Sequence, residues 1–257
     1  MRLNEYYEFA IQTAYLAGRL TLGYYQTGLQ PDIKADNSPV TAADRASEQL
    51  IRQRIESHYP GHAIIGEEYG VKETEGATFR WYIDPIDGTQ SFIHGVPLYA
   101  VLLGLEIEGH PSVGAVYFPA LDEMLAAADG LGCWWNGRRA HVSEVSSLKE
   151  ATFSFTDPRN FVIRGCVDVW DRLLQSTRYR TGWSDAYGYL LTATGRIELT
   201  LDPFMAPWDC GPFPPIFAEA GGYFGDWQGK VTLYGGEAVA TSQKLLPEVL
   251  AILAGKP

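Results

Sequence analysis

The chain has 257 residues, of which 46% are hydrophobic and 13% aromatic, a composition that excludes an intrinsically disordered protein. Its 31 acidic and 20 basic residues give a net charge of −11, which argues against nucleic acid as a partner. No apolar run approaches the roughly 18 residues of a membrane span. Glu5 and Glu8 stand where a signal peptide needs an uncharged core, so we expect a soluble protein that begins near Met1 and has no membrane partner.

The three cysteines carry no sign of covalent or metal cross-linking. Cys133, Cys166 and Cys210 are odd in number and show no C-x-x-C spacing, so neither a disulfide framework nor a zinc site is expected. A reducing, cytoplasmic location fits this cysteine content.

The first half of the chain predicts two helices followed by strands. Apolar residues at three- and four-residue spacing predict a helix over Leu3–Gln26, and Thr41 with Asp44 has the form of a capping box that opens a second helix. Asn136-Gly137 is typical of a hairpin turn. Five strands, separated by Gly and Pro, are expected at Ala63–Ile65, Phe79–Ile83, Ala100–Glu106, Ser112–Phe118 and Met124–Ala128.

Beyond Leu148 the pattern alternates between helix and strand, which favours a mixed α/β fold of two packed lobes, 1–148 and 149–257, with the site in the cleft between them. The expected elements are helices at Asn160–Gln175 and Ala186–Thr194, a strand at Ile197–Leu201, a helix up to Ala220 capped by Gly221-Gly222, a strand at Val239–Thr241 and a helix at Pro247–Leu253.

The sharpest local feature is an apolar strand that ends in Asp84-Pro85-Ile86-Asp87-Gly88-Thr89. Pro85 fixes the backbone so that the two carboxylates can converge, and Gly88 lets the backbone approach a ligand closely. Further acids follow other elements, at Glu67-Glu68 and Asp209. Carboxylate oxygens are the ligands that Mg²⁺ prefers, whereas Asp-x-x-Asp by itself is more often a solvated turn.

Together these segments resemble the inositol monophosphatase-like superfamily of Mg²⁺-dependent, lithium-sensitive phosphatases. The signature segments are Gly66-Glu67-Glu68, the run Asp84 to Thr89, and Trp208-Asp209 continuing to Glu219-Ala220-Gly221-Gly222. The resemblance extends from the Lys34 region through Ala238-Val239-Ala240-Thr241, which is most of the chain. It implies a layered sandwich of helix pairs and sheets and a phosphatase that acts through metal-activated water.

The resemblance also implies roles for individual residues. Two to three Mg²⁺ ions are expected, the first held by Glu67, Asp84 and the carbonyl of Ile86, the second by Asp84, Asp87 and Asp209, and a third near Glu67. Asp44, Glu67 and Thr89 are the expected catalytic residues, with Asp44 and Thr89 orienting the water. The amides of Gly88 and Thr89 would take the phosphate. One departure is Pro212, Pro214 and Pro215 after Trp208-Asp209, which we expect to delay the helix and affect the aim of Asp209.

Within the superfamily, Asp185-Ala186-Tyr187-Gly188-Tyr189 and Gly225 to Lys230 resemble the histidinol-phosphate phosphatase branch, which acts in histidine biosynthesis. L-Histidinol phosphate carries an ammonium, so Asp185 and Asp202 are expected to contact the substrate together with Asp209, and Tyr187, Tyr189 or Trp183 would stack on its imidazole. Asp185 could equally cap a helix, Asp202 could be a turn acid, and the tyrosines could be core residues.

Two other functions stay open at this point. One is an inositol-1-phosphate phosphatase or a broader sugar-phosphate or nucleotide phosphatase of the same superfamily. The other is a non-catalytic regulator that binds metal or phosphate, although every expected catalytic residue is present. The resemblance further implies a homodimer.

Overall fold

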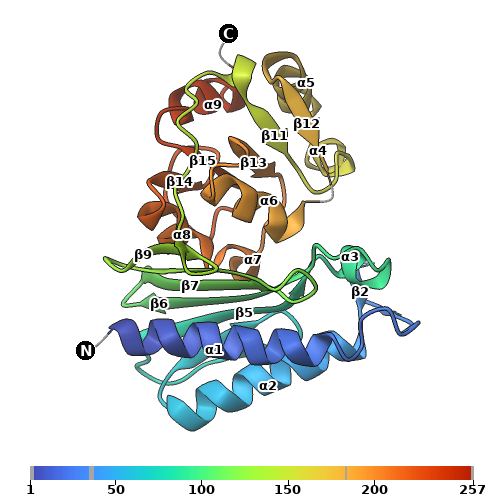
Figure 1. Cartoon of the computed structure of the whole chain (residues 1–257), viewed down its shortest axis with the longest axis vertical. Helices are drawn as coiled ribbons and strands as arrows, with labels where there is room; N and C mark the ends of the chain where they lie inside the picture. The colour runs from blue at the N-terminus through green and yellow to red at the C-terminus, as the bar shows by residue number, and fades with distance from the viewer. Residues whose placement is uncertain (1–2, 35–37, 183, 256–257) are drawn as a thin grey trace.

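Helices and sheets alternate in layers in the computed structural model, which describes residues 3–34, 38–182 and 184–255 (Figure 1). The layers are, in order, a helix pair, an eight-stranded sheet, a central layer of helices, a five-stranded sheet and an outer group of helices. This arrangement confirms the mixed α/β class and the layered sandwich. No helix in the described ranges is long and apolar enough to cross a membrane.

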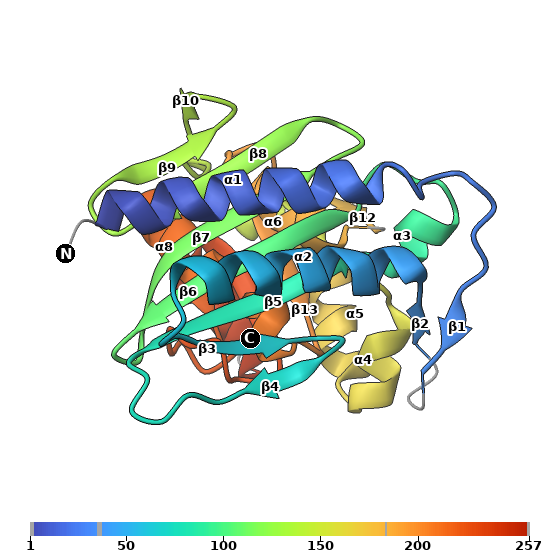
Figure 2. The ribbon, with the colours of Figure 1, turned by 90° about the horizontal axis from the view of Figure 1, so that it is seen from below.

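The larger sheet comes from the first half of the chain, and the helix pair α1 (Leu3–Thr21) and α2 (Ala42–His58) runs side by side across one of its faces (Figure 2). Strands β3 and β5 pair in parallel, so their carboxyl ends lie at the same end of the larger sheet. From edge to edge the strands are β10 (Arg138–Arg139), β9 (Gly132–Trp135), β8 (Glu123–Ala128), β7 (His110–Phe118), β6 (Ala100–Ile107), β5 (Phe79–Asp87), β3 (Ala63–Gly66) and β4 (Gly70–Lys72).

The smaller sheet comes from the second half of the chain. Its strand order is β12 (Tyr179–Thr181), β11 (Thr152–Ser154), β13 (Leu199–Asp202), β15 (Ala238–Ser242) and β14 (Gly222–Gly225). The remaining elements are β1 (Asp32–Ile33) paired with β2 (Pro39–Val40), α3 (Thr89–Ile93), a 3-10 turn (Leu148–Glu150), α4 (Arg159–Arg164), α5 (Val167–Ser176), α6 (Asp185–Ala193), α7 (Pro207–Cys210), α8 (Phe213–Glu219) and α9 (Leu246–Leu253).

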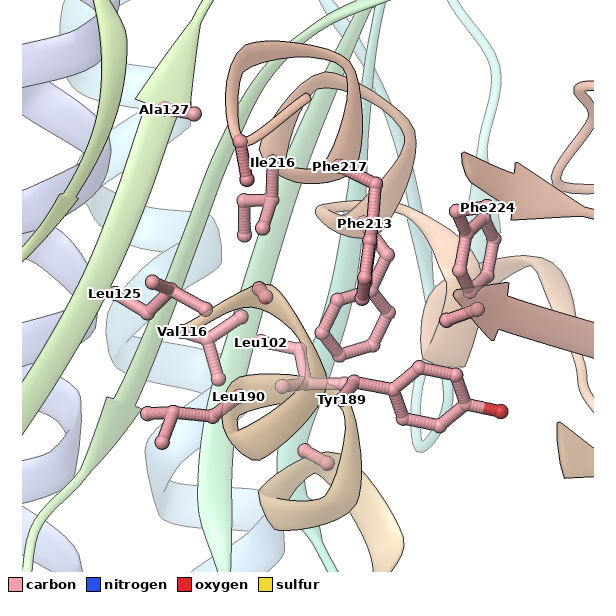
Figure 3. Packing of buried hydrophobic residues seen from close by; sticks show 14 of the residues in the cluster. Leu102, Val116, Leu125, Ala127, Tyr189, Leu190, Phe213, Ile216, Phe217 and Phe224 are labelled. Carbon is pink, nitrogen blue, oxygen red and sulfur yellow. The ribbon is translucent and has the colours of Figure 1, made fainter. Parts of the chain in front are cut away.

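Apolar clusters fill the spaces between the layers. The central cluster joins α6 and α8 to the inner face of the larger sheet, as Figure 3 shows for Tyr189, Phe213, Leu102 and Val116. Because residues from both halves of the chain form this one cluster, the two expected lobes are packed together. Their boundary at residue 148 stays a prediction.

Two glycines on the larger sheet allow the segment between α7 and α8 to pack directly against it. Gly104 on β6 and Gly114 on β7 are cross-strand partners. A Cβ on Gly104 would lie 2.5 Å from the carbonyl oxygen of Gly211, and one on Gly114 would lie 2.8 Å from Cα of Pro212. The backbone between α7 and α8 therefore lies directly on the sheet, because no side chain separates them.

Several local predictions are confirmed. Thr41 and Asp44 form the capping box that begins α2, and the Asn136-Gly137 turn has φ angles of 45° and 75°, as the hairpin turn requires. The five strands expected in the first half are all present, with ends that differ by up to four residues.

Four element predictions need correction. The first helix ends at Thr21 rather than Gln26, because the chain then makes turns in which Gly23 N–H bonds to Leu20. The helix expected over Asn160–Gln175 is two helices, α4 and α5, separated at Gly165, whose φ of 75° no continuing helix allows.

The strand expected at Ile197–Leu201 begins two residues later, at Leu199, where pairing with Thr241 starts. The prolines after Asp209 do not delay the helix: α7 begins ahead of them at Pro207. Gly211 and Pro212 keep right-handed helical angles before α8 begins.

Candidate active site

The end of β5 places two carboxylates on one wall of a cavity. Asp84 pairs with Leu102 and Asp87 with Ala100, so an extra residue bulges from β5 between them. The carboxylate of Asp84 also accepts the amide of Ile86 at 3.0 Å. The bulge turns both acids toward the same cavity of about 190 Å³.

Two more acids reach this cavity from other elements. Glu67 follows β3, the parallel neighbour of β5, and Asp209 lies on α7. The loop that carries Glu67 is held by Glu48, a fully buried side chain on α2 that accepts the amide of Glu68 at 2.7 Å. Asp209 is fixed by the amide of Ala206, also at 2.7 Å. The structure thus brings together the four acids that the sequence singled out.

Crowding of these acids disfavours their charged forms. Burial raises the pKa of Asp84 well above its usual value, and the charges of Glu67, Asp87 and Asp209 raise it further. Burial and the neighbouring Asp185 raise the pKa of Asp87 in the same way, and burial raises the pKa of Asp209 to about 7. Several carboxyl groups therefore compete to ionise in one small space, which is costly unless a cation enters.

One positively charged side chain, that of Lys34, contacts these acids. Lys34 Nζ lies 2.7 Å from Glu67 Oε1 and also binds Glu68. Burial lowers the pKa of Lys34, but the two carboxylates outweigh it and hold the pKa above its usual value. Within the described ranges, no group of three or more His, Cys, Asp and Glu side chains has the arrangement to hold a metal ion in this conformation.

Asp44 and Thr89 flank the acids from two helices. Asp44 Oδ2 caps α2 by accepting the Thr41 amide at 2.8 Å, whereas Oδ1 is buried and has no hydrogen-bond partner. Burial raises the pKa of Asp44 to about 6. Thr89 Oγ1 donates to the carbonyl of Ile86 at 3.1 Å, and Gly88, with a φ of 79°, begins α3. An unused buried acceptor on Asp44 suits a bound water or cation.

Asp185 lines the cavity next to the end of β5. It does not cap α6, since the cap position is Ser184 and no side chain makes a capping bond there. Its φ of 39° is unusual for a residue other than glycine, and its Oδ2 accepts a hydrogen bond from Ser91 on α3 at 3.3 Å. The next amide, of Ala186, donates to Asp87 at 2.6 Å. Asp185 therefore joins the second half of the chain to the end of β5.

Asp202 also lines the cavity, but both of its carboxylate oxygens accept hydrogen bonds from other residues of the chain. Oδ1 accepts the Thr156 amide at 2.9 Å and Oδ2 accepts the Tyr189 hydroxyl at 3.0 Å. Only 3% of Asp202 is exposed. The side chain holds the segment after β11 against α6.

The expected aromatic contacts are distributed differently. Tyr187 donates to Glu123 and lines neither of the cavities around the acids, and the ring of Tyr189 is buried against Phe213. Trp183 lies outside the described residues. The cavity walls include residues that no sequence pattern marked, because they come from separate turns: Phe155, Thr156, Asn160, Phe204 and Met205.

Comparisons with known proteins show the family of the chain. The profile of the inositol monophosphatase family matches residues 2–255. A histidinol-phosphatase of Chlorobaculum parvum is 39% identical over 249 residues, 96% of each chain, and a histidinol-phosphatase of Mycobacterium tuberculosis is 36% identical over 88% of each. The solved inositol monophosphatase of Anabaena superposes with a TM-score of 0.86 at 28% identity, covering 100% of this chain and 98% of its own.

The chain therefore belongs to the inositol monophosphatase family and is a phosphoric monoester hydrolase.

Proposed function

We propose that the enzyme hydrolyses L-histidinol phosphate to L-histidinol and phosphate in histidine biosynthesis. The observation that carries this proposal is Asp185, a carboxylate with no capping role that lies beside Gly88 in the cavity wall. A substrate with an ammonium at one end and a phosphate at the other gives this acid an opposite charge, whereas a neutral polyol offers it only uncharged hydroxyl donors. The names of the relatives from C. parvum and M. tuberculosis support the same choice.

We further propose that Mg²⁺ ions, two to three per site, neutralise the acids and the substrate phosphate. Glu67, Asp84 and the carbonyl of Ile86 would hold one ion, and Asp84, Asp87 and Asp209 another. The fit rests on two observations: the acids carry raised pKa values that a cation would lower, and Asp44 has a buried oxygen without a partner. When bound, the metal supplies charge neutralisation and activation of water for phosphoryl transfer.

The protein's own groups then orient the reactants. In this proposal Asp44 and Glu67 would accept a proton from the attacking water, and the hydroxyl of Thr89 would accept a hydrogen bond from it; the unpartnered Oδ1 of Asp44 supports a role for that residue. The amides of Gly88 and Thr89 would donate to the phosphate oxygens, since the positive φ of Gly88 turns the chain into α3 at this point. Asp202 would act on the substrate by fixing Thr156 and Tyr189 at the cavity wall.

The runner-up is hydrolysis of inositol 1-phosphate or of other sugar or nucleotide phosphates, which the name of the Anabaena relative, an inositol monophosphatase, supports. A homodimer in the cytoplasm is part of the same proposal.

The test is release of inorganic phosphate from L-histidinol phosphate and from inositol 1-phosphate, each with Mg²⁺ and with EDTA. We expect Mg²⁺-dependent turnover and a kcat/KM at least about 100-fold higher for L-histidinol phosphate, or about 2.7 kcal/mol of discrimination. Equal or reversed values would refute the substrate. Turnover that EDTA leaves unchanged would refute the metal.

Asp185→Asn isolates the carboxylate, because asparagine tolerates a positive φ and can keep a bond to Ser91. The ratio of kcat/KM for L-histidinol phosphate to that for inositol 1-phosphate should fall by about 10- to 100-fold, as expected for a lost charge-assisted hydrogen bond. An unchanged ratio would remove Asp185 from substrate recognition.

A further inference from the structure

A second hollow, of about 480 Å³, adjoins the acidic cavity. It is lined by residues of α3 and of the turn between β11 and α4, and α3 and α4 lie on the same side of the molecule (Figure 1). The two share walls made by Glu67, Gly88, Thr89, Thr156 and Asp185. A ligand whose phosphate lies at Gly88 can therefore extend into the second hollow without crossing the protein. The described residues that line it include three with charge, and all three are acids: Glu67, Asp157 and Asp185.

One residue that lines this hollow is Phe155, whose aromatic ring is packed against its neighbours. Phe155 follows β11 and is half-buried, and its ring meets the ring of Trp170 edge-to-face, with centroids 4.7 Å apart and planes at 90°. The ring of Phe153 also packs against the ring of Phe155, with their centroids 5.4 Å apart. The amide of Phe155 donates to Thr181 at 3.2 Å, which fixes the backbone as well. A ring immobilised on one side loses little entropy when a ligand covers the other.

Gly182 leaves space beside the ring of Phe155. A Cβ on Gly182 would lie 3.1 Å from the ring of Phe155, closer than nine in ten such contacts, so a larger residue there would press on the ring. Asp185 lies three residues further along the same segment. The hollow thus offers a flat apolar surface with a carboxylate beside it.

We propose that the second hollow binds the leaving-group alcohol, that its preferred occupant is a flat heterocycle carrying a nearby ammonium, and that Phe155 is a specificity-determining residue through stacking on that heterocycle. This inference rests on the proposed function, because the imidazole and ammonium of L-histidinol match the hollow. It assigns stacking to Phe155 in place of Tyr187 and Tyr189, neither of which lines the second hollow.

The experiment compares Phe155→Leu with the wild-type enzyme on L-histidinol phosphate and inositol 1-phosphate. Leucine keeps apolar contact with Trp170 but removes the aromatic face. We expect kcat/KM for L-histidinol phosphate to fall about tenfold more than that for inositol 1-phosphate, mainly through KM. Phe155→Tyr keeps the ring and should retain the wild-type ratio.

Phe204→Leu is the matched control, since Phe204 is a phenylalanine that lines the first cavity but not the second and is 41% exposed. Loss of selectivity in Phe204→Leu instead of Phe155→Leu would place the heterocycle there and overturn the proposal. Equal losses on both substrates in Phe155→Leu would make Phe155 a structural residue and also overturn it.

Calorimetric binding of L-histidinol gives a readout that does not depend on turnover. Phe155→Leu should weaken its binding about tenfold, while Phe155→Tyr should bind it as the wild type does. If wild-type enzyme prefers L-histidinol phosphate but Phe155→Leu binds L-histidinol normally, this inference fails while the proposed function stands. If wild-type enzyme prefers inositol 1-phosphate, both fail.

Discussion

The close packing of the segment after α7 against the larger sheet predicts how much a substitution at Gly104 destabilises the protein. In Gly104→Ala, the new Cβ would lie 2.5 Å from the carbonyl oxygen of Gly211, and real Cβ contacts essentially never fall below 3.0 Å. The obstacle is backbone, which cannot rotate away as a side chain would. The segment between α7 and α8 must therefore move by about half an ångström or more.

Overpacking of this kind costs about 1–3 kcal/mol, and a backbone obstacle puts Gly104→Ala at the upper end, about 3 kcal/mol. In a chain of this size each kcal/mol lowers the melting temperature by about 2 °C, so a fall of about 6 °C is expected. Asp209 lies two residues before Gly211 and moves with it. Since small misplacements in an active site are expensive, kcat should also fall by about tenfold or more.

The assays are denaturant unfolding in EDTA, which removes any metal contribution, and Mg²⁺-dependent phosphate release. Gly61→Ala is the matched control, because nothing lies within 4 Å of a Cβ there and no positive φ is needed. It should leave stability unchanged or raise it by about 0.5 kcal/mol. A Gly104→Ala enzyme within about 0.5 kcal/mol of the wild type, with normal turnover, would refute the close seating of α7.

Three further predictions concern the site and the outer helix pair. Asp87→Asn removes a partly buried carboxylate from the acid cluster and should lower turnover by several orders of magnitude while leaving the melting temperature in EDTA unchanged or higher; normal turnover at ordinary Mg²⁺ would contradict a ligand role. Thr89→Ala should lower kcat with little change in KM, and a change in KM alone would argue against its action on water. Burial lowers the pKa of His62, whose Nδ1 accepts the Trp81 indole N–H at 3.0 Å, so the unfolded chain binds the proton more readily and stability should fall as pH drops below about 6.5 toward the lowered pKa. In His62→Gln the slope of unfolding free energy against pH in that window should be smaller than in the wild type, and an identical slope would show that His62 does not contribute.

Much of the local structure could be read from neighbouring residues. The capping box of Thr41 and Asp44, the hairpin at Asn136-Gly137 and the acid-rich end of β5 each depend on a few consecutive residues, so their sequence patterns predict them directly. The same is true of the family, whose signature segments are short and occur in order.

Other features were decided by contacts between distant segments. Lys34 meets Glu67 across 33 residues, and Asp202 is satisfied by Thr156 across 46 residues, so no local pattern could assign either side chain its partner. The hollow beside Phe155 exists because the turn after β11, α3 and the start of α6 come together in the tertiary structure.

The amino-acid sequence by itself therefore determined which elements form and which acids end them, because hydrogen bonding and side-chain periodicity within an element are local. Only the tertiary structure decided which of those acids share a cavity, which of them contact a lysine and which aromatic ring lines the neighbouring hollow. Those outcomes depend on how separate layers pack, as the contact of Gly104 with Gly211 across 107 residues illustrates.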